Sequence, residues 1–494
     1  MITISTSKRG YLTANVNNIH IHSPYDPVRE AERYLRNQVS KAPRTVIIIG
    51  ECLGYLGQSI AKIYPNTIIH PMWLETTLEQ NALPFSYETG WDPSKPMSWQ
   101  EFISDILSKG VVGIQILIWP AMEKLFPQEI SKIYQYILTE IKQINSIKST
   151  VQHFAFQWFK NCLQNSNFIE GYYCPVQKEK IPYFIGASGT SLSEHKDWLL
   201  NNHKYIRIIA LPSSLCFFRQ LNIPVDFIIT QDSGFWADYH LEYLPYFSHI
   251  VCSLKASRRI KHLTKKPLLF SNHSWYEKII FDDKPVLSLP ELGSVIFSAI
   301  EFAKTMTDDA IILGGADFYQ KDIQTHIRPH SFDQYFDQLG SRFLGELTQK
   351  YKRMIDFNAK TIKDNYRSIF SLDYYRDWFA QQYKDTNLNQ LTPHKLRYYD
   401  LPVYKSINKK EKQSLPLELI QWEQADKERS QNIIGSIKKT ARTKQSKYLT
   451  EFFPLDYEQL SGYSETERQF HLNKLTNTWL SKVDKILPLR SPNV

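Results

Sequence analysis

Apolar and polar positions follow two alternating patterns along the first 340 residues. Short β-branched or apolar runs, which are typical of strands, alternate with segments whose apolar residues recur at helical spacing. Within residues 1–150 the strand candidates are 45–49, 67–69 and 111–119, and a helix is expected over 27–39. Such alternation is typical of parallel α/β units, so residues 1–150 are expected to form a smaller α/β N-terminal domain.

The same alternation is clearer in the middle of the chain. Residues 151–180 are expected to form a helical connection, and residues 181–340 a central domain. The strand candidates of this central domain are residues 183–185, 206–211, 226–230, 250–254, 267–271 and 310–313. Several are apolar throughout, as in strands covered on both faces, which predicts an α/β fold with a Rossmann-like parallel sheet.

Beyond residue 340 the composition shifts toward Lys, Gln and Tyr. Helices are expected over residues 420–445 and 464–486. Residues 341–494 are therefore predicted to be a helical C-terminal accessory domain.

Net charge, cysteine content and the length of apolar stretches limit the ligands and the cellular location to be expected. The net charge of +9 favours an anionic ligand, but the positive residues are too thinly spread to demand nucleic acid. The five cysteines are odd in number and lack a C-x-x-C pair, as expected for reduced thiols. The chain has neither a signal-peptide pattern nor an apolar stretch long enough to span a membrane, so a cytoplasmic location is expected.

A small-residue turn between a strand and a helix is the sharpest local signal. It contains Gly186, Ala187, Ser188, Gly189 and Ser191. Small residues let the backbone approach a ligand, and free N–H groups at a helix start attract phosphate, so the turn is a candidate phosphate cradle. The alternative is an ordinary tight βα turn. It is not a Walker loop, because no Gly-Lys-Ser/Thr follows.

Acidic residues follow two of the apolar strand candidates. Asp232 and Asp317 stand at carboxyl ends of strands, where open α/β sheets bind ligands. The alternative for each is a turn or cap residue. Ser213 and Gly315, in the turns after two strands, and Gly293 and Ser294, before a helix expected at 295–306, complete the candidate nucleotide-binding residues. An ordinary Ser-capped helix is the alternative for the last pair.

No metal site is indicated by the sequence. There is no D-x-D pair and no His/Cys cluster with zinc-ligand spacing, so a metal-independent reaction without a cofactor is expected. His326 and His330 are candidate general bases because a histidine near neutral pKa accepts a hydroxyl proton; a surface histidine is the alternative. The basic run at residues 257–266 is typical of a solvated helix face.

These segments together resemble the core of the motility-associated Maf glycosyltransferases. The resemblance rests on residues 186–192, 221–226, 232 and 314–319 with His326, and it includes the DUF115 domain shared with 6-hydroxymethylpterin diphosphokinases (MptE-like). Residues 22–31 and 50–55 also resemble the Maf N-terminal domain, which the pterin kinases lack. The core is similar to bacterial sialyltransferases too, although Ala187 and Thr190 depart from their Gly-x-Gly-Pro-Ser-Leu loop.

The resemblance implies a function. A nonulosonic acid (pseudaminic, legionaminic or sialic type) would pass from a CMP-activated donor to Ser or Thr of flagellin, with Asp232, Asp317 and His326 as catalytic residues. One alternative is a pterin-type diphosphokinase, which needs ATP and Mg²⁺. A second is a non-catalytic flagellin-binding factor whose nucleotide site has decayed.

Overall fold

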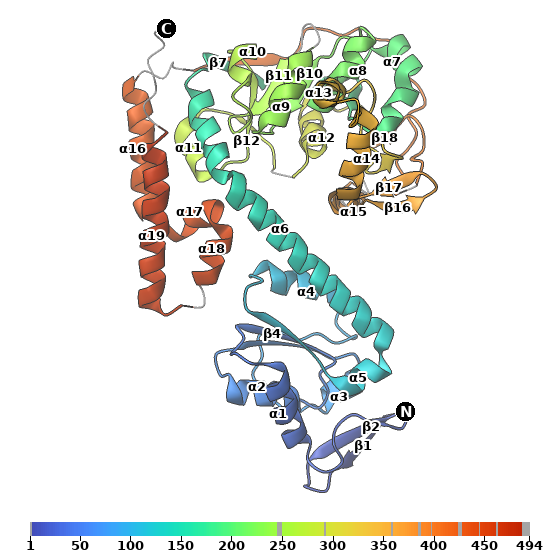
Figure 1. Ribbon diagram of the computed structural model, residues 1–494, viewed down its shortest axis with the longest axis vertical. Coiled ribbons are helices and arrows are strands. Elements are labelled where there is room, and N and C mark those ends of the chain that lie inside the picture. Colours follow the sequence, from blue (N-terminus) through green and yellow to red (C-terminus); the bar gives the residue numbers. More distant parts are fainter. Residues whose placement is uncertain are drawn as a thin grey trace. The chain divides into compact units, whose positions relative to one another are not determined.

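The computed structural model describes residues 2–244, 249–290, 293–356, 359–383, 387–396, 398–422, 427–443, 445–460 and 463–486. The chain forms two compact units (Figure 1). Unit 1 comprises Met1–Ala155 with Ala441–Val494, and unit 2 comprises Phe156–Thr440. The boundary between them falls within α6 (Pro127–Ser166), a helix of 40 residues.

Unit 1 is built on a three-stranded parallel sheet in the order β5 (Ile68–Met72), β4 (Thr45–Ile49), β6 (Ile114–Ile118). Its helices are α1 (Pro27–Gln38), α2 (Tyr55–Ile63), α3 (Thr76–Gln80), α4 (Trp99–Ser108) and α5 (Pro120–Leu125). The parallel α/β pattern predicted for the first 150 residues is thus confirmed. A separate antiparallel sheet of β1 (Ile2–Thr6), β2 (Leu12–Val16) and β3 (Ile19–His20) was not predicted.

The two N-terminal segments of the Maf resemblance meet in a buried polar cluster. His22, only 2% exposed, accepts a hydrogen bond at Nε2 from Leu53 N–H at 3.4 Å. The Glu51 carboxylate accepts from the N–H groups of Cys52 and Gly57, both at 3.0 Å. Burial raises the pKa of Glu51 to about 7 and lowers that of His22 to about 3. These residues hold the loop after β4 and the start of α2 together.

The last helices of the chain belong to unit 1. They are α17 (Gln445–Phe452), α18 (Pro454–Gln459) and α19 (Glu465–Asp484). Glu458 fixes them to the segment before β6, because its carboxylate accepts from Val111 N–H at 2.5 Å and from Lys148 Nζ at 2.5 Å. The C-terminal region is helical, as predicted.

Unit 2 is organised by a ten-stranded sheet in the order β18-β14-β8-β9-β10-β11-β12-β7-β19, with β13 paired to β12. The bounds are β7 (Gly171–Pro175), β8 (Tyr183–Gly186), β9 (Arg207–Ala210), β10 (Phe227–Thr230), β11 (His249–Ser253), β12 (Leu268–Ser271), β13 (Leu287–Ser288), β14 (Ile311–Gly314), β18 (Leu388–Gln390) and β19 (Leu417–Gln421). The pairs are parallel except β19 with β7. All six strand candidates of the central domain are confirmed.

Helices and short 3-10 helices connect the strands, and α16 follows the last strand. They are η1 (Thr190–His195), α7 (Lys196–Asn202), η2 (Pro212–Ser214), α8 (Leu215–Gln220), α9 (Phe235–His240), η3 (Leu241–Tyr243), α10 (Ile260–Leu263), α11 (Trp275–Phe281), α12 (Val295–Met306), α13 (Ser331–Leu339), α14 (Glu346–Asp356), α15 (Phe370–Gln382) and α16 (Lys427–Thr443). A small antiparallel sheet is formed by β15 (Gln320–Lys321), β17 (Tyr366–Ser368) and β16 (Lys360–Lys363). The core on one face joins Phe297 and Phe302 of α12 to Phe227 and Leu313 of the sheet.

The predicted boundary at residue 340 needs correction. Strands β18 and β19 lie beyond it yet belong to the central sheet, and unit 2 continues to Thr440. The helix expected over 420–445 is in fact the end of β19 followed by α16. Both strands sit at edges of the sheet, where half-polar sequences such as Leu-Asn-Gln and Leu-Glu-Leu-Ile-Gln are tolerated because one side is not paired.

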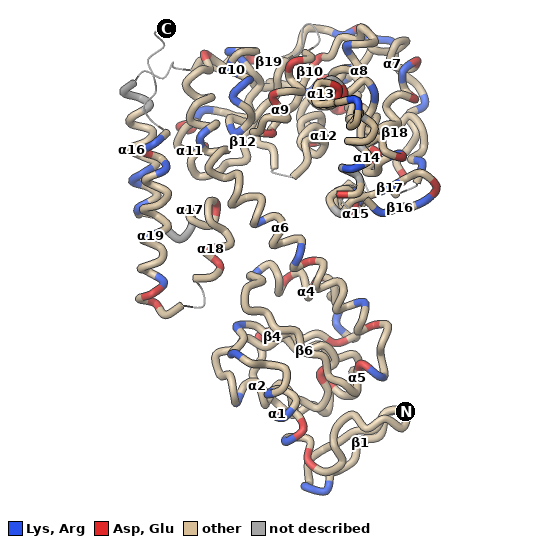
Figure 2. Tube along the Cα trace, in the orientation of Figure 1, with Lys and Arg blue, Asp and Glu red and all other residues tan. Residues whose placement is uncertain are grey.

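The structure shows where the cysteines and the charged residues lie. All five cysteines are free thiols, and four of them are buried. Figure 2 shows Lys and Arg distributed over both units rather than gathered on one element. Across the described residues, no helix has the length and apolar character needed to cross a membrane. Most of the basic run at 257–266 is locally paired: Arg258 with Gln164, Arg259 with Glu242 and Lys265 with Glu170.

Candidate functional site

The strand order places a topological switch point between β8 and β14. From β8 the chain adds β9, β10, β11 and β12 in one direction, and β14 then pairs with the other side of β8. Loops that leave two such strands diverge and open a crevice at the carboxyl edge, where α/β sheets bind ligands. The loop after β8 (residues 187–191) and the loop after β14 (residues 315–319) both start there.

The two loops touch through their backbones. The N–H groups of Ala187 and Gly189 donate to the carbonyls of Gly314 and Gly315, each at 2.8 Å. A Cβ on Gly189 would lie 2.4 Å from the Gly315 oxygen, and one on Gly315 would lie 2.5 Å from the Ala187 oxygen. Gly315 also has a φ of +73°, a conformation that favours glycine. The small residues therefore allow loop-to-loop contact.

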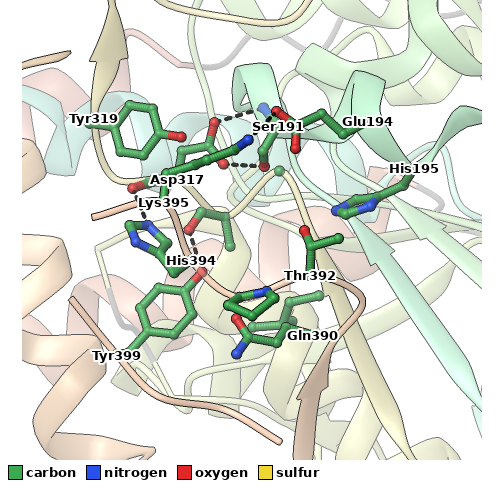
Figure 3. Close-up of a pocket in the computed structure, with 14 residues that line it drawn as sticks. Ser191, Glu194, His195, Asp317, Tyr319, Gln390, Thr392, His394, Lys395 and Tyr399 are labelled. Atoms are coloured by element: carbon green, nitrogen blue, oxygen red, sulfur yellow. Dashed lines mark hydrogen bonds and ion pairs between the residues drawn. The ribbon is translucent and has the colours of Figure 1, made fainter. Parts of the chain in front are cut away.

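Asp317 ties the same loops together through its side chain (Figure 3). Its carboxylate accepts from Ser191 N–H at 2.9 Å, from the Ser191 hydroxyl, and from Thr190 Oγ1 at 3.2 Å, and the residue is only 4% exposed. The N–H groups of Ala187, Gly189 and Ser191 thus all have protein acceptors. These three N–H groups are therefore not free to hold a phosphate, and phosphate binding by the turn as a whole stays a prediction.

The helix after this turn has two parts. It begins as the 3-10 helix η1 and becomes α7 at Lys196. At its start, the Ser191 hydroxyl donates to Asp317, and Glu194 pairs with Lys395 at 3.1 Å.

Three further predicted residues lie around the same loop. Ser188 accepts at its carbonyl from Ile327 N–H at 2.7 Å, which brings His326 beside the loop. His326 is half-buried, and its ring stacks on that of His330 with centroids 4.4 Å apart. The Gly186 carbonyl accepts from the Ser214 hydroxyl at 2.7 Å, so the half-buried Ser213, which precedes Ser214 in η2, lies near the end of β8.

Asp232 lies at the same edge but farther along it. It follows β10, which is three strand intervals from β14, so about 14 Å separates the two strand ends at ordinary strand spacing. Asp232 is exposed, yet the surrounding protein disfavours its charge and raises its pKa above the ordinary value.

Gly293 and Ser294 precede α12 near Asp232. The Gly293 carbonyl accepts from Tyr375 Oη at 3.0 Å. Burial, and then the nearby charge of Asp232, raise the pKa of Tyr375, which places this hydroxyl in the neighbourhood of Asp232. Ser294 is the N-cap residue of α12, but its side chain makes no capping hydrogen bond. Glu291 and Leu292, which precede this pair in the sequence, lie outside the described residues.

A hollow at the β14 end of the edge contains residues that sequence reasoning missed (Figure 3). It encloses about 350 Å³, part of it open solvent. Besides residues of the two loops, it is lined by Gln390, Thr392, His394, Lys395 and Tyr399 from β18 and the segment after it. His394 contacts the Asp317 carbonyl through Nε2 at 2.9 Å, and Tyr399 donates to the Ala316 carbonyl at 2.8 Å. Burial lowers the pKa of His394, so its neutral form is favoured.

The predicted residues thus share one edge of the sheet in two groups. Asp317, the loop after β8 and His326 form the first, and Asp232, Gly293 and Ser294 the second. Within the described ranges, no group of three or more His, Cys, Asp or Glu is arranged to hold a metal ion. The side chains brought together at this edge include carboxylates, histidines and hydroxyls.

Comparisons with known proteins agree with this architecture. Residues 141–322 match the family model described as 6-hydroxymethylpterin diphosphokinase MptE-like. An uncharacterised protein of Treponema pallidum (strain Nichols) is 23% identical over 269 residues, which are 53% of this chain and 59% of the relative. The chain thus spans about three fifths of the length of that relative.

A solved structure, a Maf glycosyltransferase from Magnetospirillum magneticum AMB-1, is similar with a TM-score of 0.56 and 11% identity, covering 98% of this chain and 91% of that one. The fold and site therefore define an α/β protein with a crevice at a topological switch point. More particularly, residues 141–322 match the MptE-like family model, and the fold of the whole chain is similar to that of a Maf glycosyltransferase. The resemblance indicated by the sequence motifs is confirmed at this level.

Proposed function

We propose that this protein is a glycosyltransferase that transfers a nonulosonic acid from a CMP-activated donor to Ser or Thr of flagellin, in the cytoplasm and without a metal ion. The observation that carries the proposal is the arrangement of residues along the carboxyl edge formed by β14, β8, β9 and β10. Two glycine-dependent loops meet at its switch point, and β10, the strand that precedes the accessible Asp232 carboxyl, ends three strand intervals or about 14 Å away. That span suits an extended donor such as a nucleotide joined to a sugar.

The residues suggest a division of roles. Asp317 holds the loops after β8 and β14 in place, so we assign it to positioning. Asp232 is the better candidate for the base, because a raised pKa makes a carboxylate a stronger proton acceptor. In this scheme the acceptor hydroxyl attacks the anomeric carbon, the bond from that carbon to the phosphate oxygen of CMP breaks, and Asp232 takes the hydroxyl proton. His326, beside Ser188, would then face the departing phosphate.

The direct test is incubation of the purified protein with flagellin and CMP-activated sialic, legionaminic or pseudaminic acid. The expected result is a mass gain on the intact acceptor, equal to one or more sugar residues, with release of an equal amount of CMP. No mass gain and no CMP release with any of the three donors would contradict the proposal.

Asp232→Asn provides the matched control for this test. The change keeps the shape of an exposed side chain, so folding should be unaffected, whereas loss of the base should lower the transfer rate by about 10²- to 10⁴-fold. The raised pKa also gives the unsubstituted protein a pH dependence. Transfer should fall as the pH drops through a value above the ordinary Asp pKa, since protonated Asp232 cannot accept a proton. Equal rates for Asp232→Asn and the unsubstituted protein would assign the base elsewhere.

One alternative has an observation in its favour. The family model that matches residues 141–322 is described as a 6-hydroxymethylpterin diphosphokinase MptE-like domain. Incubation with 6-hydroxymethylpterin, ATP and Mg²⁺ tests this reading. Formation of the pterin diphosphate with AMP would favour the kinase, and its absence together with sugar transfer would favour the glycosyltransferase.

A further inference from the structure

One buried amide contacts both the loop that contains Asp232 and the neighbouring loop after β11. Asn161, on α6 and fully buried, donates from Nδ2 to the carbonyls of Ser233 at 3.3 Å, Lys255 at 3.2 Å and Ala256 at 3.0 Å. Ser233 follows Asp232 directly in the loop after β10, whereas Lys255 and Ala256 belong to the loop after β11. A single side chain therefore bridges the ends of two neighbouring strands.

Other contacts complete this bridge. Ser257 N–H donates to the Asp232 carbonyl at 2.9 Å, so the backbone of Asp232 is attached to the loop that Asn161 holds. Gln157, one turn earlier on α6, donates to Asn161 Oδ1 at 2.6 Å and fixes the orientation of the amide with its NH₂ group toward the loops. The network leaves the Asp232 side chain exposed while its backbone is fastened.

We infer that Asn161 is a positioning residue, which sets the place of the Asp232 carboxyl at the carboxyl edge of the sheet by tying the loop after β10 to the loop after β11. The inference rests on the proposed function only in the role it gives to Asp232. An amide suits this place because its NH₂ group donates to several carbonyls at once, whereas a carboxylate of the same shape only accepts.

Asn165, one turn later on α6, offers a matched control. It is also buried, and its Nδ2 donates to the carbonyls of Leu254 at 2.9 Å and Ala256 at 3.0 Å. Both acceptors lie before Ser257, and no carbonyl of the Asp232 loop is among them. Asn161→Asp and Asn165→Asp are therefore the same isosteric change in the same helix, but only the first releases the Asp232 loop.

Both substitutions should lower the melting temperature, so the kinetics are measured at a temperature at which both variants are folded. Asn161→Asp is expected to lower kcat for sugar transfer by about 10- to 100-fold, with KM for the donor nearly unchanged, because misplacement of a reacting group by about 1 Å has effects of this size. Asn161→Asp should also shift the acidic limb of the pH–rate profile, because that limb reports the titration of Asp232. Asn165→Asp should keep kcat within about 2-fold and leave the pH–rate profile unchanged, since a loss of stability that does not move the reacting group alters neither quantity.

Amide hydrogen exchange gives a second measurement that does not depend on catalysis. Residues 231–237 should exchange faster in Asn161→Asp than in Asn165→Asp, while residues 254–257 should exchange faster in both. Unchanged exchange at 231–237 in Asn161→Asp, or an equal loss of kcat in both variants, would overturn the inference. If the unsubstituted protein transfers no sugar, the proposed function fails, and the exchange result still decides whether Asn161 holds the Asp232 loop.

Discussion

Replacing Asp317 with alanine is expected to lower sugar transfer by at least about 100-fold. The Asp317 carboxylate is the acceptor for Ser191 N–H, the Ser191 hydroxyl and the Thr190 hydroxyl, and its removal leaves donors without acceptors at a site that is only 4% exposed. The loop after β8 should then lose its fixed distance from the loop after β14. Because these hydrogen bonds are charge-assisted, the free energy of unfolding should also fall, by about 3 kcal/mol.

Two further variants make this prediction specific. Asp317→Asn keeps an oxygen for Ser191 N–H, so it should be more stable than Asp317→Ala and retain more activity. Asp337→Ala removes an exposed carboxylate from α13 and should leave both transfer and stability unchanged. Urea denaturation and the transfer assay measure the two effects. Transfer at the unsubstituted rate by a folded Asp317→Ala protein would contradict the role assigned to this residue.

Replacement of Arg207 with methionine is expected to produce the largest loss of stability, about 3–5 kcal/mol. Arg207 opens β9 at the amino edge, opposite the site, and its side chain is 6% exposed. It pairs with Glu179 at 2.8 Å and with Asp226 at 3.1 Å, and it donates to the Gln413 carbonyl at 2.5 Å. Without the guanidinium, two largely buried carboxylates face each other with fewer positive partners, which is the costly case for a buried ion pair.

The measurement is urea denaturation followed by circular dichroism. Arg258→Met is the control, because this exposed arginine contacts Gln164 at the surface and its loss should change the free energy of unfolding by about 0.5 kcal/mol or less. A stability of Arg207→Met within about 1 kcal/mol of the unsubstituted protein would show that the remaining Lys412–Asp226 pair, at 2.6 Å, satisfies the network.

The central strands could be predicted from the sequence because they are apolar on both faces. β8, β10 and β14 are four-residue, fully buried runs bounded by turns, and each was found within about two residues. The sequence did not reveal β18 and β19, because β18 is only three residues long and β19 alternates apolar and polar residues. Such sequences are tolerated in strands at the edge of a sheet. The antiparallel sheet of β1, β2 and β3 was not predicted either, because many of its positions are exposed and its strands therefore lack continuous apolar runs.

The site could be predicted only as far as it is local. Residues at strand ends are visible in the sequence, so Asp232, Asp317 and the loop after β8 were named. That Asp317 binds Ser191 depends on β14 lying next to β8, and strand order is not encoded in either segment. For the same reason the sequence did not indicate His394 and Tyr399, which reach the site from beyond the predicted domain boundary. Nor did it indicate Asn161, because a polar residue within a long helix does not show what it contacts.

Calorimetric titration with CMP tests the central claim, that the edge formed by β14, β8, β9 and β10 binds the nucleotide of a CMP-activated sugar. The unsubstituted protein is predicted to bind CMP at one site per chain, more tightly than AMP, and Asp317→Ala is predicted to lose this binding while Asp337→Ala keeps it. Binding of ATP with Mg²⁺ in the absence of any CMP signal, or equal CMP binding by Asp317→Ala, would contradict the claim.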